Sequence, residues 1–276
     1  MDFGDKVQKA TKTKGILYRS RLKLRDEPVF TPADVIKYAA DDRKVAIESF
    51  NVPERVIVTY QRSVFEHVEQ TFRGKPKEWL HGDSQPFVIM SLANVEIGIA
   101  RSWIGSPAAA MVLEELVACG AKKVFEVGCV GTLQPTLKPG DMVVVSEAIR
   151  DEGTSHHYFP QNVGLESSLR LRDLLAEVLS EKKLQYRIGP VWTTDGVYRE
   201  TRRKLLRLRG EGVLGVNMET SALFAVAKYR GVEMASAQVV SDVLSEDGWL
   251  PAFRHEPVRE ALKALAECVV EALARG

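Results

Sequence analysis

The sequence has few of the residues that build disulfide frameworks or metal sites. It holds three cysteines, at positions 119, 129 and 268 of 276 residues. Disulfide frameworks use even cysteine counts, and zinc sites need closely spaced ligand pairs. The adjacent His156 and His157 have no cysteine or carboxylate partner at ligand spacing. We therefore expect no metal and no disulfide, as in proteins of a reducing compartment.

Long apolar runs are absent as well. No stretch approaches the roughly 20 apolar residues that span a bilayer, and the first residues, MDFGDKVQKATKTKG, lack the apolar core of a signal peptide. The 38 Lys and Arg nearly balance the 37 Asp and Glu, with a formal charge of +1. No overall field therefore attracts nucleic acid or an anionic membrane. We expect a cytoplasmic protein that binds neither, and that holds any anionic ligand through local groups.

From residue 56 onward, short β-rich runs alternate with helical patterns, which favours an α/β fold. Strands are predicted over 56–60, 86–90, 95–100, 123–128, 142–149, 186–194 and 233–241, and helices over 107–119, 221–230 and 257–274. The last helix has one apolar face, so it should lie flat against the sheet. No linker marks a second domain. We predict a single domain over 51–276, preceded by an N-terminal extension and lead-in over 1–50.

A glycine-bearing segment follows the strand predicted at 123–128. Gly128 and Gly131 allow close backbone approach, and we interpret them as a turn at the end of the strand. Free N–H groups at such a turn bind small ligands in many α/β proteins. A plain tight turn is the alternative interpretation. The spacing G-x-x-G differs from the dinucleotide fingerprint G-x-G-x-x-G, which argues against a Rossmann nucleotide site.

Two later segments place polar side chains at the ends of short apolar runs. Glu219 stands at the start of a predicted helix, where a carboxylate can accept hydrogen bonds from the vicinal hydroxyls of a ribose. The alternative is that it only stabilises the first turn of its own helix. Ser241 and Asp242 end the strand predicted at 233–241. Polar groups at the carboxyl end of a buried strand are candidate site residues.

Taken in this fixed order, the segments resemble the nucleoside phosphorylase superfamily, in particular the uridine phosphorylase and hexameric purine nucleoside phosphorylase family. The resemblance rests on Gly128 to Asp141, Arg150 to Pro160, Thr193 to Asp195, Val216 to Glu219, and Ser241 with Asp242. It implies a single α/β domain with a central mixed β-sheet, partly barrel-like, flanked by helices. It also implies a homo-hexamer built as a trimer of dimers, and no cofactor, with inorganic phosphate as co-substrate.

The resemblance implies roles for particular residues. Met218 and Glu219 match the pair that holds the ribose. Asp242 matches the acid that protonates a purine ring nitrogen, and the Ser241-Asp242 pair is the purine version of the motif. To hold a proton, Asp242 should be partly buried. Arg254 falls near the place of a helper arginine.

Three further residues are base-binding candidates from the segment that follows the predicted strand 186–194. They are Asp195, Tyr198 and Arg199. The glutamine and arginine that read uracil in uridine phosphorylases have no counterparts at the same spacing, so Arg199 is a candidate substitute. Tyr198 could supply the aromatic face that purine enzymes often take from a phenylalanine.

The phosphate pocket of the family is altered in this sequence. No Gly-Asp-Pro loop follows the strand at 56–60, Glu126 stands in place of an arginine, and Cys129 replaces a hydroxyl residue beside Gly128. A carboxylate about 4 Å from a phosphate charge would repel it by about 4 kcal/mol at an intermediate dielectric. Three interpretations follow: Arg62, with a basic residue such as Arg73 from a neighbouring subunit, rebuilds the pocket; Glu126 pairs with an arginine; or water replaces phosphate.

The leading hypothesis is therefore a nucleoside phosphorylase, a pentosyltransferase of nucleotide salvage that leans towards purine ribonucleosides and yields free base and ribose 1-phosphate. A nucleosidase that cleaves the same bond with water is the first alternative. The second is a catalytically silent relative that binds a nucleoside.

Overall fold

A ten-stranded mixed sheet forms the centre of the molecule. The computed structural model describes residues 27–276, so residues 1–26 of the predicted N-terminal extension lie outside the described part. The strands are β1 (Arg55–Thr59), β2 (Lys75–Lys77), β3 (Phe87–Leu92), β4 (Val95–Arg101), β5 (Lys123–Thr132), β6 (Met142–Asp151), β7 (Tyr186–Thr194), β8 (Gly215–Asn217), β9 (Glu233–Ser245) and β10 (Gly248–Pro251). Their order across the sheet is β10-β9-β6-β7-β8-β5-β1-β4-β3-β2.

Part of this sheet closes on itself. Besides its place next to β6, strand β9 also pairs with β5 in parallel, with a register shift between Val130 and Gly131. Strands β9, β6, β7, β8 and β5 therefore form a five-stranded ring, and β1, β4, β3 and β2 extend from β5 as an open wing. This arrangement confirms the prediction of a single α/β domain with a partly barrel-like mixed sheet.

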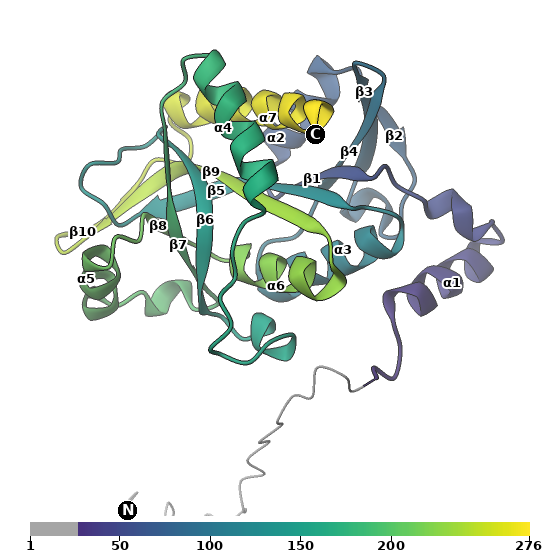
Figure 1. Cartoon of the computed structure of the whole chain (residues 1–276), viewed down its shortest axis with the longest axis horizontal. Helices are drawn as coiled ribbons and strands as arrows, with labels where there is room; N and C mark the ends of the chain where they lie inside the picture. The colour runs from purple at the N-terminus through teal and green to yellow at the C-terminus, as the bar shows by residue number, and fades with distance from the viewer. Residues whose placement is uncertain (1–26) are drawn as a thin grey trace, which may run out of the picture.

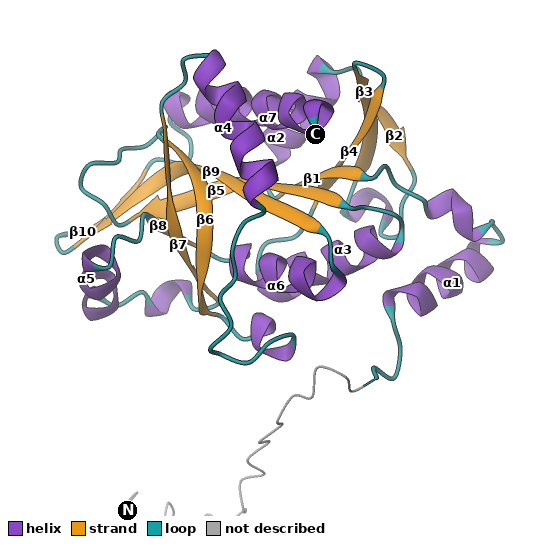
Figure 2. Ribbon diagram, viewed as in Figure 1, coloured by secondary structure: helices purple, strands orange, loops and turns teal. Residues whose placement is uncertain are grey.

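Helices cover both faces of the sheet (Figure 1). In the described part of the chain they are α1 (Pro32–Arg43), α2 (Arg62–Thr71), α3 (Ser106–Ala118), α4 (Leu169–Glu181), α5 (Arg202–Gly210), α6 (Thr220–Arg230) and α7 (Glu256–Arg275). Helices α2, α4 and α7 share one apolar core with the sheet, and α1, α3 and α6 share the other. Figure 2 shows the two helical layers with the strands between them.

The helix ends follow simple local rules. Helices α3 and α7 each carry a proline in their first turn, where the missing N–H costs no hydrogen bond. Helix α6 ends at Gly231, which has φ +71°, a left-handed conformation that glycine adopts without steric cost. The predicted helices and strands are all present. Helix α7 packs on the sheet through a stripe that includes Val258, Leu262 and Leu265, as its apolar face predicts.

Two glycines that we interpreted as a turn lie inside a strand instead. Strand β5 continues through Gly128 and Gly131 to Thr132, because β9 and then β8 pair with it along this stretch. The prediction of a turn is therefore wrong. Gly131 is needed for a different reason: a Cβ atom there would lie 2.8 Å from Oδ2 of Asp242 and 2.6 Å from Leu244. The glycine lets the Asp242 carboxyl lie against the backbone of β5.

Candidate active site

Four of the predicted site residues lie near the place where β5, β8 and β9 meet: Met218, Glu219, Ser241 and Asp242. Gly131 of β5 pairs with Val216 of β8 on one side and with Asp242 of β9 on the other. Two residues after β8 ends, Glu219 caps helix α6. Neighbouring strands lie about 4.8 Å apart, so these two carboxyl-bearing segments are separated by about 10 Å of sheet.

Glu219 joins the N-termini of two helices. Its carboxyl accepts hydrogen bonds from the backbone N–H of Gly105, at 2.8 Å, and of Met218, at 3.1 Å. Gly105 caps α3, so the carboxyl serves a neighbouring helix rather than only the first turn of its own. Ser106 adds a bond from its hydroxyl to the Met218 carbonyl at 2.6 Å. Burial, followed by the nearby Glu126, raises the pKa of Glu219 to about 8.

Asp242 is only 7% exposed, as expected for the proposed acid. Its Oδ1 accepts a hydrogen bond from the hydroxyl of Ser241 at 2.7 Å, and its Oδ2 accepts one from the indole N–H of Trp249 at 2.8 Å. The thiol of Cys129 lies close to the same group and contacts Ser241; burial raises the pKa of Cys129 to about 12. The thiol is therefore neutral, and it presents no anion to a bound ligand.

Glu126 is fully buried and is not paired with an arginine among the described residues. It accepts hydrogen bonds from the hydroxyls of Tyr60, at 2.9 Å, and Thr220, at 2.6 Å. The Tyr60 ring also lies over Gly128, since a Cβ there would be 3.6 Å from two ring carbons. Burial raises the pKa of Glu126, against the opposite effect of its hydrogen bonds. The Glu126–arginine ion pair, one of the three interpretations of the altered pocket, is not formed within residues 27–276, where Glu126 bonds to neutral hydroxyls instead.

A buried polar network beneath these carboxyls was not predicted from the sequence. The Asn217 amide donates to Thr220 at 2.7 Å and to Gln238 at 3.2 Å, and its oxygen accepts from the hydroxyl of Thr193 at 2.8 Å. Ser221 at the start of α6 donates to Glu152 at 2.8 Å. The network fixes the start of α6, and therefore the position of Glu219. The sequence does carry one sign of this network: polar residues such as Thr193 and Gln238 stand inside otherwise apolar strands.

Several other candidates lie apart from this buried group. Arg62 is exposed and donates to Glu66 of its own helix at 2.6 Å, and Asp195 is exposed and accepts from the Gly153 N–H at 2.8 Å. Tyr198 is 97% exposed, and Arg199 and Arg254 are exposed as well. Within one chain, the structure does not gather these residues around Glu219 and Asp242.

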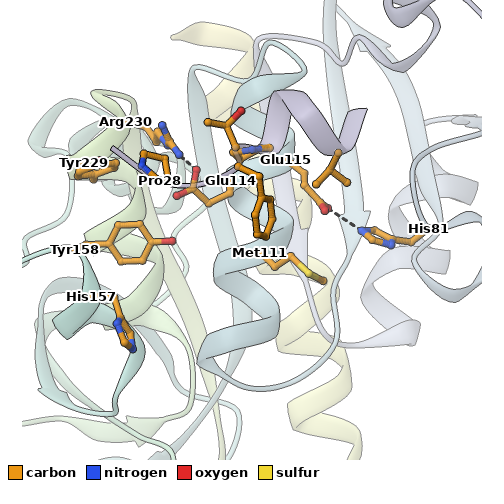
Figure 3. Close-up of a pocket in the computed structure, with 13 residues that line it drawn as sticks. Pro28, His81, Met111, Glu114, Glu115, His157, Tyr158, Tyr229 and Arg230 are labelled. Carbon is orange, nitrogen blue, oxygen red and sulfur yellow. Dashed lines mark hydrogen bonds and ion pairs between the residues drawn. The ribbon is translucent and has the colours of Figure 1, made fainter. Parts of the chain in front are cut away.

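A well-formed cavity lies elsewhere. It has a volume of about 550 Å³ and lies between residues 28–35, helix α3 and the end of α6. Figure 3 shows its two carboxyls already paired, Glu114 with Arg230 at 2.5 Å and Glu115 with His81 at 2.7 Å. Within residues 27–276 no cluster of three or more histidine, cysteine or acidic side chains could hold a metal ion, and no helix is long and apolar enough to cross a membrane.

Residues 56–274 match the family model of the Phosphorylase superfamily, so the chain belongs to this superfamily. A DeoD-type purine nucleoside phosphorylase of Bacillus cereus is 30% identical over 148 residues, which cover 53% of this chain and 63% of that protein. The uncharacterized protein R802 of Acanthamoeba polyphaga mimivirus is 25% identical over 186 residues, 67% of this chain and 72% of that protein. The matched part of the Bacillus relative is thus less than two thirds of its length.

A solved structure has the same fold. The uridine phosphorylase of Vibrio fischeri superposes with a TM-score of 0.73 at 24% identity, covering 83% of this chain and 95% of that chain. The resemblance inferred from the sequence motifs is confirmed at the level of the superfamily and the fold. Purine and pyrimidine enzymes both occur among the relatives.

The burial of Glu126 gives a prediction for stability. In the unfolded chain this carboxyl ionises near its ordinary pKa of 4.5, whereas the folded protein retains the proton to higher pH. The unfolded state therefore binds fewer protons above that value, and the free energy of unfolding falls as pH rises. In Glu126→Gln we expect a shallower fall between pH 5 and 9, and a gain of about 1 kcal/mol or more over wild type at pH 9.

Urea unfolding across that pH range measures this dependence, with Glu211→Gln, an exposed acid directly after α5, as the matched control. The amide can still accept a hydroxyl bond, so the fold should persist. Equal pH slopes for Glu126→Gln and wild type would show that Glu126 is ionised in the folded protein.

Proposed function

We propose that this protein cleaves the N-glycosidic bond of a ribonucleoside, with a preference for purines, and transfers the ribosyl group to phosphate. The products would be free base and ribose 1-phosphate. The proposal is carried by the placement of Glu219 and Asp242, two buried carboxyls on either side of the Gly131 segment of β5. One can accept hydrogen bonds from sugar hydroxyls, and the other can protonate the base.

Cleavage of the glycosidic bond needs protein groups at both the sugar and the base of the substrate. Departure of the base leaves an oxocarbenium-like sugar, and protonation of a ring nitrogen lets the base leave as a neutral molecule. General acid catalysis of this kind is worth about 10²-fold to 10⁴-fold in rate. The Ser241-Asp242 pair supports the preference for purines. Met218 would pack against the sugar held by Glu219.

Whether phosphate can accept the ribosyl group depends on the charge of Glu126. An ionised carboxyl beside phosphate would cost about 4 kcal/mol, but burial favours the neutral form of Glu126 and its contacts are hydroxyl groups. Phosphate then meets no fixed negative charge from this residue. We propose inorganic phosphate as co-substrate, with no other cofactor, and a homo-hexamer in which a neighbouring subunit supplies the cations that Arg62 does not provide within its own chain.

Hydrolysis by water is the second candidate. It is favoured by one observation: the Tyr60 ring lies over Gly128, where a bound oxyanion would need access to the backbone. Water needs far less room than phosphate. A nucleosidase would use the same Glu219 and Asp242, so the two candidates differ only in the acceptor.

Base release from inosine, adenosine and uridine, with and without phosphate, tests the proposal. For the phosphorylase we expect inosine or adenosine to be cleaved faster than uridine, ribose 1-phosphate to be formed, and base release to fall by about 10²-fold or more when phosphate is removed. Unchanged release without phosphate would establish the nucleosidase. No release under either condition would leave a nucleoside-binding protein without this activity.

A further inference from the structure

Strands β9 and β10 form a hairpin that covers the base end of the site. Trp249 of β10 pairs with Leu244 of β9, and Pro251 pairs with Asp242. The loop between the strands holds Glu246, which bonds to Arg209 of helix α5 at 2.9 Å. The loop of the hairpin therefore contacts α5, and the end of β10 lies beside Asp242.

Both oxygens of the Asp242 carboxyl accept hydrogen bonds. Ser241 donates to Oδ1 and the Trp249 indole donates to Oδ2. A serine hydroxyl can rotate and act as donor or acceptor, but an indole nitrogen is only a donor. The bond from Trp249 therefore occupies a lone pair of Oδ2 and offers no acceptor to a proton on that oxygen. Donors aimed at a carboxyl also favour its charged form, so the observed arrangement holds Asp242 as an acceptor.

The two partners differ in their exposure. Asp242 is 7% exposed, whereas Trp249 is 60% exposed, and the rings of Trp249 and Phe253 lie 6.1 Å apart, with Phe253 51% exposed. An aromatic pair at the rim of the site offers a flat apolar surface to a nucleobase. The indole ring is thus both the contact that covers Asp242 and a side chain that can move into solvent.

Resting on the proposed function, we propose that Trp249 is a positioning residue that holds Asp242 unprotonated until an incoming nucleobase displaces the indole. Once Oδ2 is released, Asp242 takes a proton from solvent water. As the glycosidic bond breaks, this proton passes to the ring nitrogen and the bond electrons remain on the base, which leaves neutral. Asp242 is again a carboxylate, and the indole N–H can return to it.

Within residues 27–276, Ser241 and Trp249 are the side chains that donate hydrogen bonds to the Asp242 carboxyl, and no titratable group does so. Cys129 on β5 is a neutral thiol. Glu200, which follows the short helix η4 (Val197–Arg199), has a pKa raised to about 7, first by burial and then by the charge of Asp242, while Lys204 acts in the opposite direction. Near neutral pH, Glu200 is therefore partly protonated, and Trp249 remains the contact that is specific to the hairpin.

The pH dependence of base release from Trp249→Phe tests the proposal. Phenylalanine keeps an aromatic ring but donates no hydrogen bond, so the contact that favours the charged carboxylate is lost. We expect the alkaline limb of the kcat/KM profile to move up by about one pH unit, with a several-fold gain over wild type at pH 9 and little change at pH 6. A uniform loss at every pH would overturn the proposal, since that is the result of a structural role. Leu250→Ala, on the same strand and 62% exposed, is the control for damage to the hairpin.

Tryptophan fluorescence gives a readout that does not require catalysis. Trp79 and Trp192 are buried, so Trp249 and Trp103 are the exposed fluorophores. Titration with hypoxanthine should change the emission of wild type, and this change should be lost in Trp249→Phe while calorimetry still detects binding. If no nucleoside is cleaved but the Trp249 signal responds to the base, the proposed function fails and displacement of the indole stands. Hypoxanthine that binds without a Trp249 signal, or does not bind, would refute the displacement.

Discussion

Replacing Asp242 with asparagine is expected to lower kcat/KM for base release from inosine by about 10²-fold to 10⁴-fold. Asparagine keeps the size of the side chain and can still accept a hydrogen bond from Trp249, so the hairpin contact should survive. It cannot deliver a proton at any pH. Base release followed by absorbance, together with an unfolding curve to confirm the fold, measures the effect.

A substrate that needs no proton distinguishes lost acid catalysis from lost binding. The base of 7-methylinosine carries a positive charge before it leaves, so it departs as a neutral molecule without help. We expect Asp242→Asn to cleave this substrate within about tenfold of the wild-type rate. Asp247→Asn, an exposed acid in the loop of the same hairpin, should leave both rates unchanged. An equal loss on inosine and 7-methylinosine would show that Asp242 binds the base without protonating it.

The fold could be predicted in large part because its longer elements carry local patterns. Buried strands such as β1 and β6 appear in the sequence as short β-branched runs, and α3 and α6 have clear ends. Helix α4 was missed although Leu171, Leu175 and Val178 recur at helical spacing. Strands β8 and β10 have three and four residues. Pairing with neighbouring strands, rather than any local pattern, determines that such short segments form strands.

The burial of Glu219 and Asp242 could be anticipated from the sequence, whereas the contacts that several residues share could not. Glu219 and Asp242 come from segments whose order resembles the family, and both are buried side chains at the predicted place. The partners of Glu126 could not be inferred, because Tyr60 and Thr220 lie 66 and 94 residues away in the sequence. A lone glutamate in an apolar strand shows that partners must exist, since a buried charge needs them. The pattern does not show which residues they are.

Loss of the Glu219 carboxyl should have the second large effect on activity. Hydrogen bonds to a charged group contribute about 1.5–3 kcal/mol each, so at pH 9, where Glu219 is ionised, loss of two from the ribose hydroxyls predicts kcat/KM lower by about 10²-fold to 10³-fold or more in Glu219→Ala. A substrate without those hydroxyls should lose much less. Comparing inosine with 2′,3′-dideoxyinosine in both proteins measures the difference, with Glu177→Gln, an exposed acid on α4, as control. Equal losses on the two substrates would place Glu219 in a structural role, as the group that joins the N-termini of α3 and α6.

Glu219→Gln separates the charge of this group from its bonds to the protein. The amide oxygen can still accept from Gly105, whereas Met218, which donates to the other carboxyl oxygen, loses its partner. The bond from Ser106 to the Met218 carbonyl does not involve Glu219, so the ends of α3 and α6 should remain joined. In wild type the pKa of Glu219 is about 8, and the ionised form is the stronger acceptor for hydroxyl groups. Binding of a ribonucleoside should therefore tighten as pH rises from 7 to 9, and ribose binding should in turn favour ionisation of Glu219. The glutamine variant has no group to ionise, so its dissociation constant, measured by calorimetry without phosphate, should stay constant over that range.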